Sequence, residues 1–316
     1  MRRRDIYLSP WSVDPDRDPI RNPLRPLSLR HEDFEDHFDF TTVFYDCFWN
    51  AASDAVILIG PPLLNLERDL GLSVIAYPSM VRCELTLRHV FLGCQVVMKA
   101  PAGTTALIMR TATSDSFIAP QPNLCELFRN RRTAVTLSRN NDLTWIRDWA
   151  TFNKHYHNCD GILIYDNSSD AYGINDIYDC LGPIADGMQI VVVSWPFKYG
   201  VADWRLPLSY GMLDSLYCQT GMLEHARHRF LSQASGVLNT DVDELVLTED
   251  GSGIFELVES STTGLLLFNG VWVENYPTAR KRSAAPPPRH RDFAWVRAGD
   301  QIGCEPKWAV VPSRVP

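Results

Sequence analysis

Asp241 and Asp243 stand two residues apart and are the side chains whose spacing most directly suggests chemistry. They follow an apolar stretch, Gly236–Thr240, that we expect to form a strand. In extended backbone, side chains two residues apart point to the same side, so one divalent cation could bridge the two carboxylates. Carboxylates completed by water and substrate phosphates are typical ligands of such cations. Acidic triplets at strand ends are also common as solvated surface charge, so the triplet alone decides little.

A second polar turn, Asp166 to Asp170, follows the apolar run Gly161–Tyr165. An unbroken apolar run between turn-forming residues is typical of a parallel strand that is covered on both faces. Ligands of open α/β sheets bind at the carboxyl ends of such strands. Asp166 is therefore a candidate ligand-binding residue. An Asx-type turn that merely closes the strand is an equal alternative.

The elements that would position these residues alternate between strands and helices. We expect strands over Thr133–Ser138, Gly161–Tyr165, Met188–Ser194 and Gly236–Thr240, and helices over Leu143–His155 and Ile174–Leu181. This alternation predicts an α/β fold with a parallel sheet. A further helix is expected over Pro207–Phe230. His225 and His228 could together bind a metal ion, but no third ligand is near them in the sequence, so we expect a solvated or sugar-facing helix surface.

Composition divides the chain into three parts. Residues 1–30 are dense in Pro, Asp and Arg, which predicts an extended arm. Residues 31–130 contain short β-branched stretches separated by Gly and Pro, which predicts a β-rich lobe. Residues 131–316 carry the α/β pattern.

Bulk properties exclude some classes of protein. The chain has 316 residues and a formal net charge of -8, with no long basic run, which disfavours nucleic acid as a partner. No apolar run approaches the roughly 20 residues that a membrane-spanning helix needs, and no signal peptide is recognisable. We expect a cytoplasmic protein, with peripheral association at the inner face of a membrane as an option. The eight cysteines show no metal-binding spacing and are expected to be reduced thiols.

The motifs of the α/β part, taken together, resemble a known family. They are Arg139-Asn-Asn-Asp142, Asp148-Trp149, Tyr156-His157, Asp160–Ser169, Gln219 and Asp241–Leu245. In order and spacing they resemble the GT-A-fold glycosyltransferases of the family 92 and family 2-like group, over about Arg131 to Pro312. The resemblance implies a Rossmann-like GT-A (nucleotide-diphospho-sugar transferase) sheet. It also implies a nucleotide-sugar donor, with a UDP-sugar favoured over a GDP-sugar, a bound Mn²⁺ or Mg²⁺, and inversion at the anomeric carbon.

The resemblance assigns roles to individual residues. Asp241 would lie near the ribose and the metal ion, and Asp243 would be the direct metal ligand. Asp166 would contact the base or ribose of the donor. The remaining residues of the implied donor nucleotide site are Arg139, Asn140, Asn167, Ser168 and Gln219.

Inverting transfer also needs a base that takes the proton of the acceptor hydroxyl. Glu274, which ends the apolar stretch after Leu265, is our candidate, and Asp292 is the alternative. An ordinary strand-end glutamate is an equal interpretation of Glu274. The basic, Pro-rich run Thr278–His290 is expected to be either a mobile loop at the acceptor or diphosphate, or a plain linker.

The chain departs from the family pattern at three places. Asp148 stands where the family has Glu, and Leu245 where it has Phe. The chain also ends at Pro316, before the position at which the family supplies a further His ligand. We therefore expect either a chain shortened at its C-terminus or a site completed by other groups.

The function that we expect from these observations is a metal-dependent inverting glycosyltransferase of the hexosyltransferase type. It would transfer a sugar to a glycan or a lipid-linked glycan, as in polysaccharide biosynthesis. Two alternatives remain. One is a non-catalytic nucleotide- or glycan-binding module on the same fold. The other is a metal-dependent nucleotidyltransferase or hydrolase.

Overall fold

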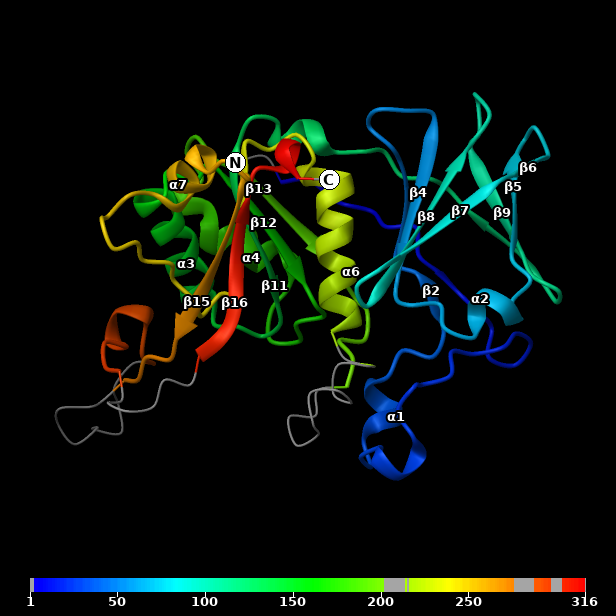
Figure 1. Cartoon of the computed structure of the whole chain (residues 1–316), viewed down its shortest axis with the longest axis horizontal. Helices are drawn as coiled ribbons and strands as arrows, with labels where there is room; N and C mark the ends of the chain where they lie inside the picture. Colours follow the sequence, from blue (N-terminus) through cyan, green and yellow to red (C-terminus); the bar gives the residue numbers. More distant parts are fainter. Residues whose placement is uncertain (1–2, 202–213, 215, 276–286, 297–302, 316) are drawn as a thin grey trace. The chain divides into compact units, whose positions relative to one another are not determined.

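The structure is a computed structural model that describes residues 3–201, 214, 216–275, 287–296 and 303–315 (Figure 1). The chain forms two compact units. Unit 1 comprises Met1–Asp5, Glu126–Ser194 and Leu231–Pro316, and unit 2 comprises Ile6–Cys125 and Trp195–Phe230. The segment Trp195–Phe230 thus groups with the N-terminal part of the chain, whereas the domain ranges predicted from the sequence place it with the α/β part.

Unit 1 is built on a six-stranded mixed sheet with the order β13-β12-β11-β14-β16-β15. Its strands are β11 (Arg132–Ser138), β12 (Gly161–Asp166), β13 (Gln189–Ser194), β14 (Gly236–Asn239), β15 (Leu265–Val271) and β16 (Gly303–Val310). The first four are parallel, whereas β16 pairs antiparallel with both β14 and β15. The predicted mixed α/β architecture and its four parallel strands are confirmed.

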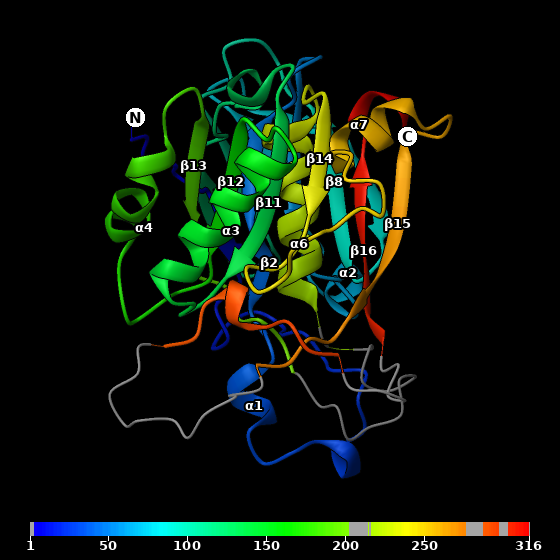
Figure 2. The same cartoon turned by 90° about the vertical axis from the view of Figure 1, so that its left-hand side faces the viewer.

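Three helices of unit 1 contribute to one apolar core with the sheet. They are α3 (Leu143–Tyr156), α4 (Ile174–Leu181) and α7 (Ile254–Ser260). Figure 2 shows α3 and α4 lying over β11, β12 and β13. Ile162 and Ile164 of β12 share this core with Trp149 of α3, and all three are fully buried. The Asp142 side chain caps α3 by accepting from Thr144 N at 2.7 Å, which explains why the helix begins at the predicted residue.

The strand order fixes where the loops of unit 1 come together. β11 pairs in parallel with β12 on one side and with β14 on the other. In this register Ser138 lies opposite Asp166, and Val135 lies opposite Asn239. The direction of winding therefore reverses at β11, and the loops after all three strands leave from the same edge.

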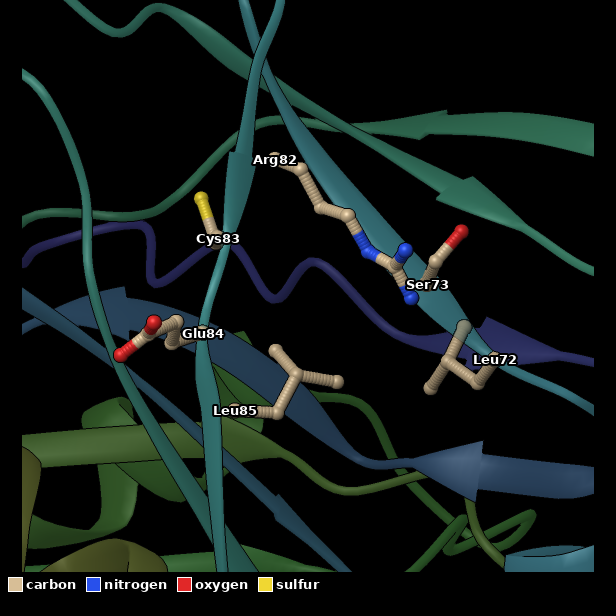
Figure 3. Close-up of a pocket in the computed structure, with 6 residues that line it drawn as sticks. All are labelled: Leu72, Ser73, Arg82, Cys83, Glu84 and Leu85. Carbon is tan, nitrogen blue, oxygen red and sulfur yellow. The ribbon is translucent and has the colours of Figure 1, made fainter.

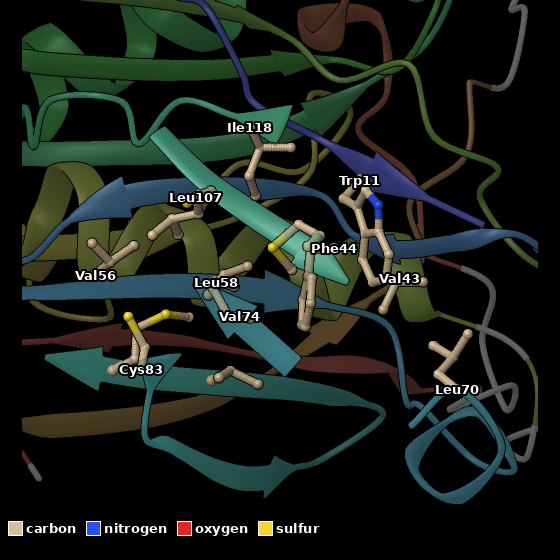
Figure 4. Packing of buried hydrophobic residues seen from close by; sticks show 14 of the residues in the cluster. Trp11, Val43, Phe44, Val56, Leu58, Leu70, Val74, Cys83, Leu107 and Ile118 are labelled. Atoms are coloured by element: carbon tan, nitrogen blue, oxygen red, sulfur yellow. The ribbon is translucent and has the colours of Figure 1, made fainter. Parts of the chain in front are cut away.

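Unit 2 contains two four-stranded antiparallel sheets, with the orders β10-β9-β5-β6 and β3-β4-β8-β7, and a two-stranded ribbon β1-β2. The strands are β1 (Trp11–Ser12), β2 (Thr42–Phe44), β3 (Asp46–Trp49), β4 (Ala55–Gly60), β5 (Ser73–Tyr77), β6 (Val81–Cys83), β7 (Leu85–Val90), β8 (Gly93–Lys99), β9 (Ala106–Arg110) and β10 (Asp115–Ile118). Figure 4 shows the core in which side chains of both sheets meet, among them Leu58, Val74 and Leu107. The expected β-rich segment is thus present.

The remaining elements are short. Unit 2 has the helices α1 (Phe34–His37), α2 (Leu66–Asp69) and α6 (Tyr217–Ala226). A π-helical turn (Arg227–Leu231) follows α6, and 3-10 turns occur at Leu27–Leu29, Cys125–Phe128, Gly182–Ile184, His290–Asp292 and Pro312–Arg314. Of the long helix expected over Pro207–Phe230, residues 207–213 and 215 lie outside the described residues. Nowhere in the described ranges is a helix both long and apolar enough to cross a membrane.

His225 of α6 is buried, which corrects the expectation of a solvated histidine pair. Its Nε2 lies 2.8 Å from Oδ2 of Asp46, and the guanidinium of Arg229 donates to the same oxygen at 2.7 Å. All three side chains are at most 1% exposed. Burial lowers the pKa of His225, so this ring stays neutral while Arg229 balances the Asp46 charge. His225 therefore belongs to an internal polar network, whereas His228 on the same face is half-buried.

Stability should depend on pH through His157, which follows α3. Its Nδ1 accepts from Ile254 N at 3.0 Å, and its Nε2 donates to Val246 O at 3.1 Å. Burial lowers the pKa of His157 from about 6.5 in the unfolded chain to about 4 in the folded protein. Between these two pH values the unfolded chain therefore binds more protons than the folded protein does. The stabilisation by His157 is thus complete above about pH 6.5 and falls as the pH drops toward 4, by about 1–2 kcal/mol after allowance for solvent screening.

We expect His157→Gln to flatten this fall in chemical denaturation measured from pH 7 to 5. The exposed His155→Gln variant is the control, and equal slopes for wild type and His157→Gln would contradict the assignment.

Asp46→Asn should destabilise unit 2 strongly, because the buried Arg229 guanidinium would lose its negatively charged partner. Breaking a buried ion pair in this way costs about 3–5 kcal/mol. Urea denaturation of this variant and of Asp54→Asn, which removes an exposed carboxylate, measures the difference. A loss below about 1 kcal/mol would mean that the network adds little to stability.

Candidate functional site

The loops after β11 and β12 are joined into one polar structure by Ser169. Its hydroxyl donates to Asp166 Oδ1 at 2.6 Å and accepts from Asn140 N at 2.9 Å. Asn140 Oδ1 accepts in turn from Asp170 N at 3.0 Å. Asn167 N donates to Ser138 O at 2.8 Å, which continues the pairing of the two strands into the loops. The loops at this edge therefore have a fixed shape.

Asp166 closes its own turn, as the Asx-type alternative predicts. Only 6% of Asp166 is exposed, and its second oxygen accepts from Ser169 N at 3.3 Å. The polar residues that these two loops expose to solvent include Arg139, Asn140, Ser168 and Asp170. Asn140 and Ser168 have positive φ angles of 53° and 58°, a conformation that non-glycine residues seldom adopt outside tight turns.

The segment Asp241–Glu244 is a tight turn and not the extended backbone in which one cation could bridge Asp241 and Asp243. Glu244 N donates to Asp241 O at 3.1 Å, and Glu244 Oε2 accepts from Asp241 N at 3.0 Å. The chain reverses because Val242, which is 1% exposed, packs into the core of unit 1. Upstream, the Trp149 indole donates to the Thr240 hydroxyl at 3.0 Å, which anchors the end of β14 on α3.

Lys307 of β16 neutralises part of this turn. Its ammonium lies 2.6 Å from Asp241 Oδ2 and 3.2 Å from Glu244 Oε2, and its side chain is only 12% exposed. Burial alone would lower the pKa of Lys307, but the hydrogen bond to Asp241 and the two carboxylate charges outweigh burial and raise it. Lys307 is therefore a permanent positive charge beside the acidic turn. We refer to these three residues as the Lys307 cluster.

Asp243 is the carboxylate of the turn that fits a divalent cation. It is exposed, and no residue that the structure describes forms a hydrogen bond or an ion pair with it. In the same described part of the chain, no three His, Cys, Asp or Glu side chains gather as a metal site. A cation here would thus be held by Asp243 together with water and phosphate oxygens, which is a usual ligand set for Mg²⁺.

The end of the basic, Pro-rich run packs against α3 and the acidic turn. Arg289 Nε donates to Asp148 Oδ2 at 2.6 Å, and the Trp145 indole donates to Pro288 O at 2.9 Å. The ring centroids of Trp145 and His290 lie 4.5 Å apart. His290 Nε2 donates to Val242 O at 2.8 Å. Residues 278–286 of the expected mobile loop lie outside the described residues, but residues 287–290 are held in place.

The two candidate bases lie on either side of this packed segment in the chain, Glu274 before it and Asp292 after it. Asp292 is exposed, lies two residues after His290, and accepts from Arg289 N at 2.8 Å. Glu274 is half-buried, and its backbone pairs with Trp295 through bonds of 2.7 and 3.2 Å. Both bases are thus carried by backbone that is connected to the acidic turn through His290.

Gln219, the remaining predicted donor residue, lies on α6 in unit 2. There its side-chain oxygen accepts from the Tyr199 hydroxyl at 3.4 Å.

Sequence reasoning missed Ser169, His290 and Lys307. A serine three residues after Asp166 has the spacing of a side-chain-closed turn, so Ser169 could have been found. Lys307 begins an apolar run, and a lysine in a buried strand needs a charged partner, which was also a usable signal. Nothing local marks His290. Its Nδ1 is buried and has no hydrogen-bond partner among the residues that the structure describes.

A hollow of about 700 Å³ in unit 2 does not share this chemistry. It is lined by Leu72, Ser73, Arg82, Cys83, Glu84 and Leu85 (Figure 3). Burial raises the pKa of the Cys83 thiol, which makes it a poor nucleophile. Figure 3 shows the Arg82 and Glu84 side chains well separated, so the hollow offers no paired acid and base.

Comparison with protein-family models finds no match, and comparison with curated proteins finds none either. The assignment of function therefore depends on the geometry of this edge and on the sequence motifs.

Ser169→Ala should loosen the loops after β11 and β12, because one hydroxyl bonds to both. The loss of these bonds should cost about 1–2 kcal/mol. It should also speed hydrogen exchange at the Asn140 amide, which donates to Ser169. Exchange measured residue by residue tests this, with the exposed neighbour Ser168→Ala as the control. An unchanged Asn140 exchange rate in Ser169→Ala would contradict the role given to Ser169.

Proposed function

We propose that the chain is a metal-dependent inverting glycosyltransferase with a GT-A-type, Rossmann-like donor site. The observation that carries the proposal is that the loops after β11, β12 and β14 share one edge, where the strand order reverses. This is the position at which open α/β sheets bind nucleotides. The edge combines a rigid polar pair of loops with an acidic turn, as a nucleoside diphosphate requires.

The donor would bind across the two parts of this edge. The exposed groups of Arg139, Asn140 and Ser168 would contact the base and ribose of a nucleotide sugar, with a UDP-sugar favoured. Asp166 would act by holding these loops in shape through Ser169. Asp243 would hold the Mn²⁺ or Mg²⁺ ion. When bound, that ion would stabilise the negative charge that develops on the departing nucleoside diphosphate.

The acceptor would be deprotonated by Glu274, or by Asp292 if Glu274 is not the base. Attack of the freed hydroxyl oxygen on the anomeric carbon would form the new glycosidic bond, break the bond to the diphosphate and invert the configuration. Trp272 and Trp295, which are 62% and 57% exposed, flank Glu274 in sequence and across the backbone bridge. Exposed aromatic rings of this kind suit the apolar faces of a sugar acceptor.

A second candidate function is a non-catalytic nucleotide- or glycan-binding module with the same architecture. The observation that favours it is the engagement of two predicted donor residues inside the protein. Asp166 bonds to its own turn and Asp241 to Lys307. Such a module would bind a nucleotide without consuming a sugar donor.

Donor consumption separates the two functions. Incubation with a panel of UDP- and GDP-sugars and Mn²⁺ should release nucleoside diphosphate slowly even without an acceptor. We expect Asp243→Ala to abolish the thermal shift produced by nucleotide plus Mn²⁺. Glu274→Ala should keep that shift and lose turnover by about 10²–10⁴-fold, since it removes only proton transfer.

Asp186→Ala, which removes an exposed carboxylate from the turn before β13, should leave both measurements unchanged. The absence of any thermal shift with every nucleotide tested would refute the transferase. Binding without donor consumption would instead support the module. Full turnover in Glu274→Ala would move the role of base to Asp292.

A further inference from the structure

The Lys307 cluster restricts which carboxylates of the acidic turn can reach a cation. Asp241 and Glu244 both point at the same ammonium, at 2.6 and 3.2 Å. Glu244 also accepts from Asp241 N, so its carboxylate is held from two directions. Asp243 alone is exposed without such a partner in the described structure. A cation that approaches the free protein therefore meets one available carboxylate.

Lys307 cannot easily move aside. It lies inside β16, opposite Phe268 of β15, and the neighbouring Trp308 pairs with Asn239 at the end of β14. Only 12% of its side chain is exposed, so solvent cannot readily replace its two partners. The positive charge of Lys307 also repels a cation that approaches Asp241 or Glu244.

We propose that Lys307 makes cation binding at the acidic turn depend on the nucleotide. A single carboxylate with water is a weak ligand set for Mn²⁺ or Mg²⁺, whereas the phosphates of a nucleoside diphosphate supply the missing oxygen ligands. The cation thus enters the site as its complex with the nucleoside diphosphate. This inference rests on the proposed function for the identity of the nucleotide, but the effect of Lys307 on the cation alone does not.

Titration of the full-length protein with MnCl₂, followed by the electron paramagnetic resonance signal of free Mn²⁺, tests the inference. Without nucleotide, wild type should bind Mn²⁺ only at about millimolar concentrations or above. The mixture of protein and UDP should bind Mn²⁺ at least about tenfold more tightly than UDP alone does.

Lys307→Met removes the charge and keeps the length of the side chain. It should raise the affinity for Mn²⁺ without nucleotide by about tenfold or more, because Asp241 and Glu244 become available and a repelling charge is lost. Lys307→Arg should behave as wild type, since it keeps the charge. Lys99→Met, on the exposed end of β8, makes the same change in net charge elsewhere and should have no effect.

Two results would overturn the inference. The first is tight Mn²⁺ binding by wild type without nucleotide, which needs no variant and so holds even if Lys307→Met does not fold. The second is a folded Lys307→Met variant that binds Mn²⁺ no better than wild type. A failure of the proposed function looks different. If only the proposed function is wrong, no nucleotide will bind to the protein, but Lys307→Met will still bind Mn²⁺ alone more tightly than wild type.

Discussion

The parallel pairing of β11 with both β12 and β14 is the constraint on which the site depends. Strands that run in the same direction end at the same edge, so their polar loops must pack beside one another. Helices α3 and α4 return the chain across the face of the sheet, so the loops that follow the strands form this edge. Backbone groups at the strand ends still need partners, and the loops supply them, as Asn167 N does for Ser138 O.

The same need for satisfied polar groups shapes the acidic turn. Val242 is drawn into the core, and the turn then places Asp241 and Glu244 beside Lys307 and leaves Asp243 outside. His290 and Arg289 join this turn to α3 and so connect the acidic turn to the backbone that carries the candidate bases. Charge balance within the protein, rather than the spacing of the two aspartates, decides which carboxylate faces solvent.

The sequence predicted the four parallel strands and the helices α3 and α4 to within two residues, because each is set by local apolar runs and turn residues. It did not predict that His225 is buried against Asp46, since helical periodicity does not show which neighbours cover a helix. The geometry of Asp241 and Asp243 was predicted wrongly because the packing of Val242 overrides an extended backbone. Lys307 and His290 reach the turn from 66 and 48 residues away, so the local sequence around the turn does not show that either residue contacts it.

A crystal structure of the protein with UDP and Mn²⁺ tests the central claim most directly. The account predicts a diphosphate beside Asp241–Glu244, with the cation on Asp243 and Lys307 still bound to Asp241. The uracil should lie against the loops that follow β11 and β12. A nucleotide bound away from this edge, or a cation coordinated by Asp241 and Glu244 with Lys307 displaced, would contradict the account.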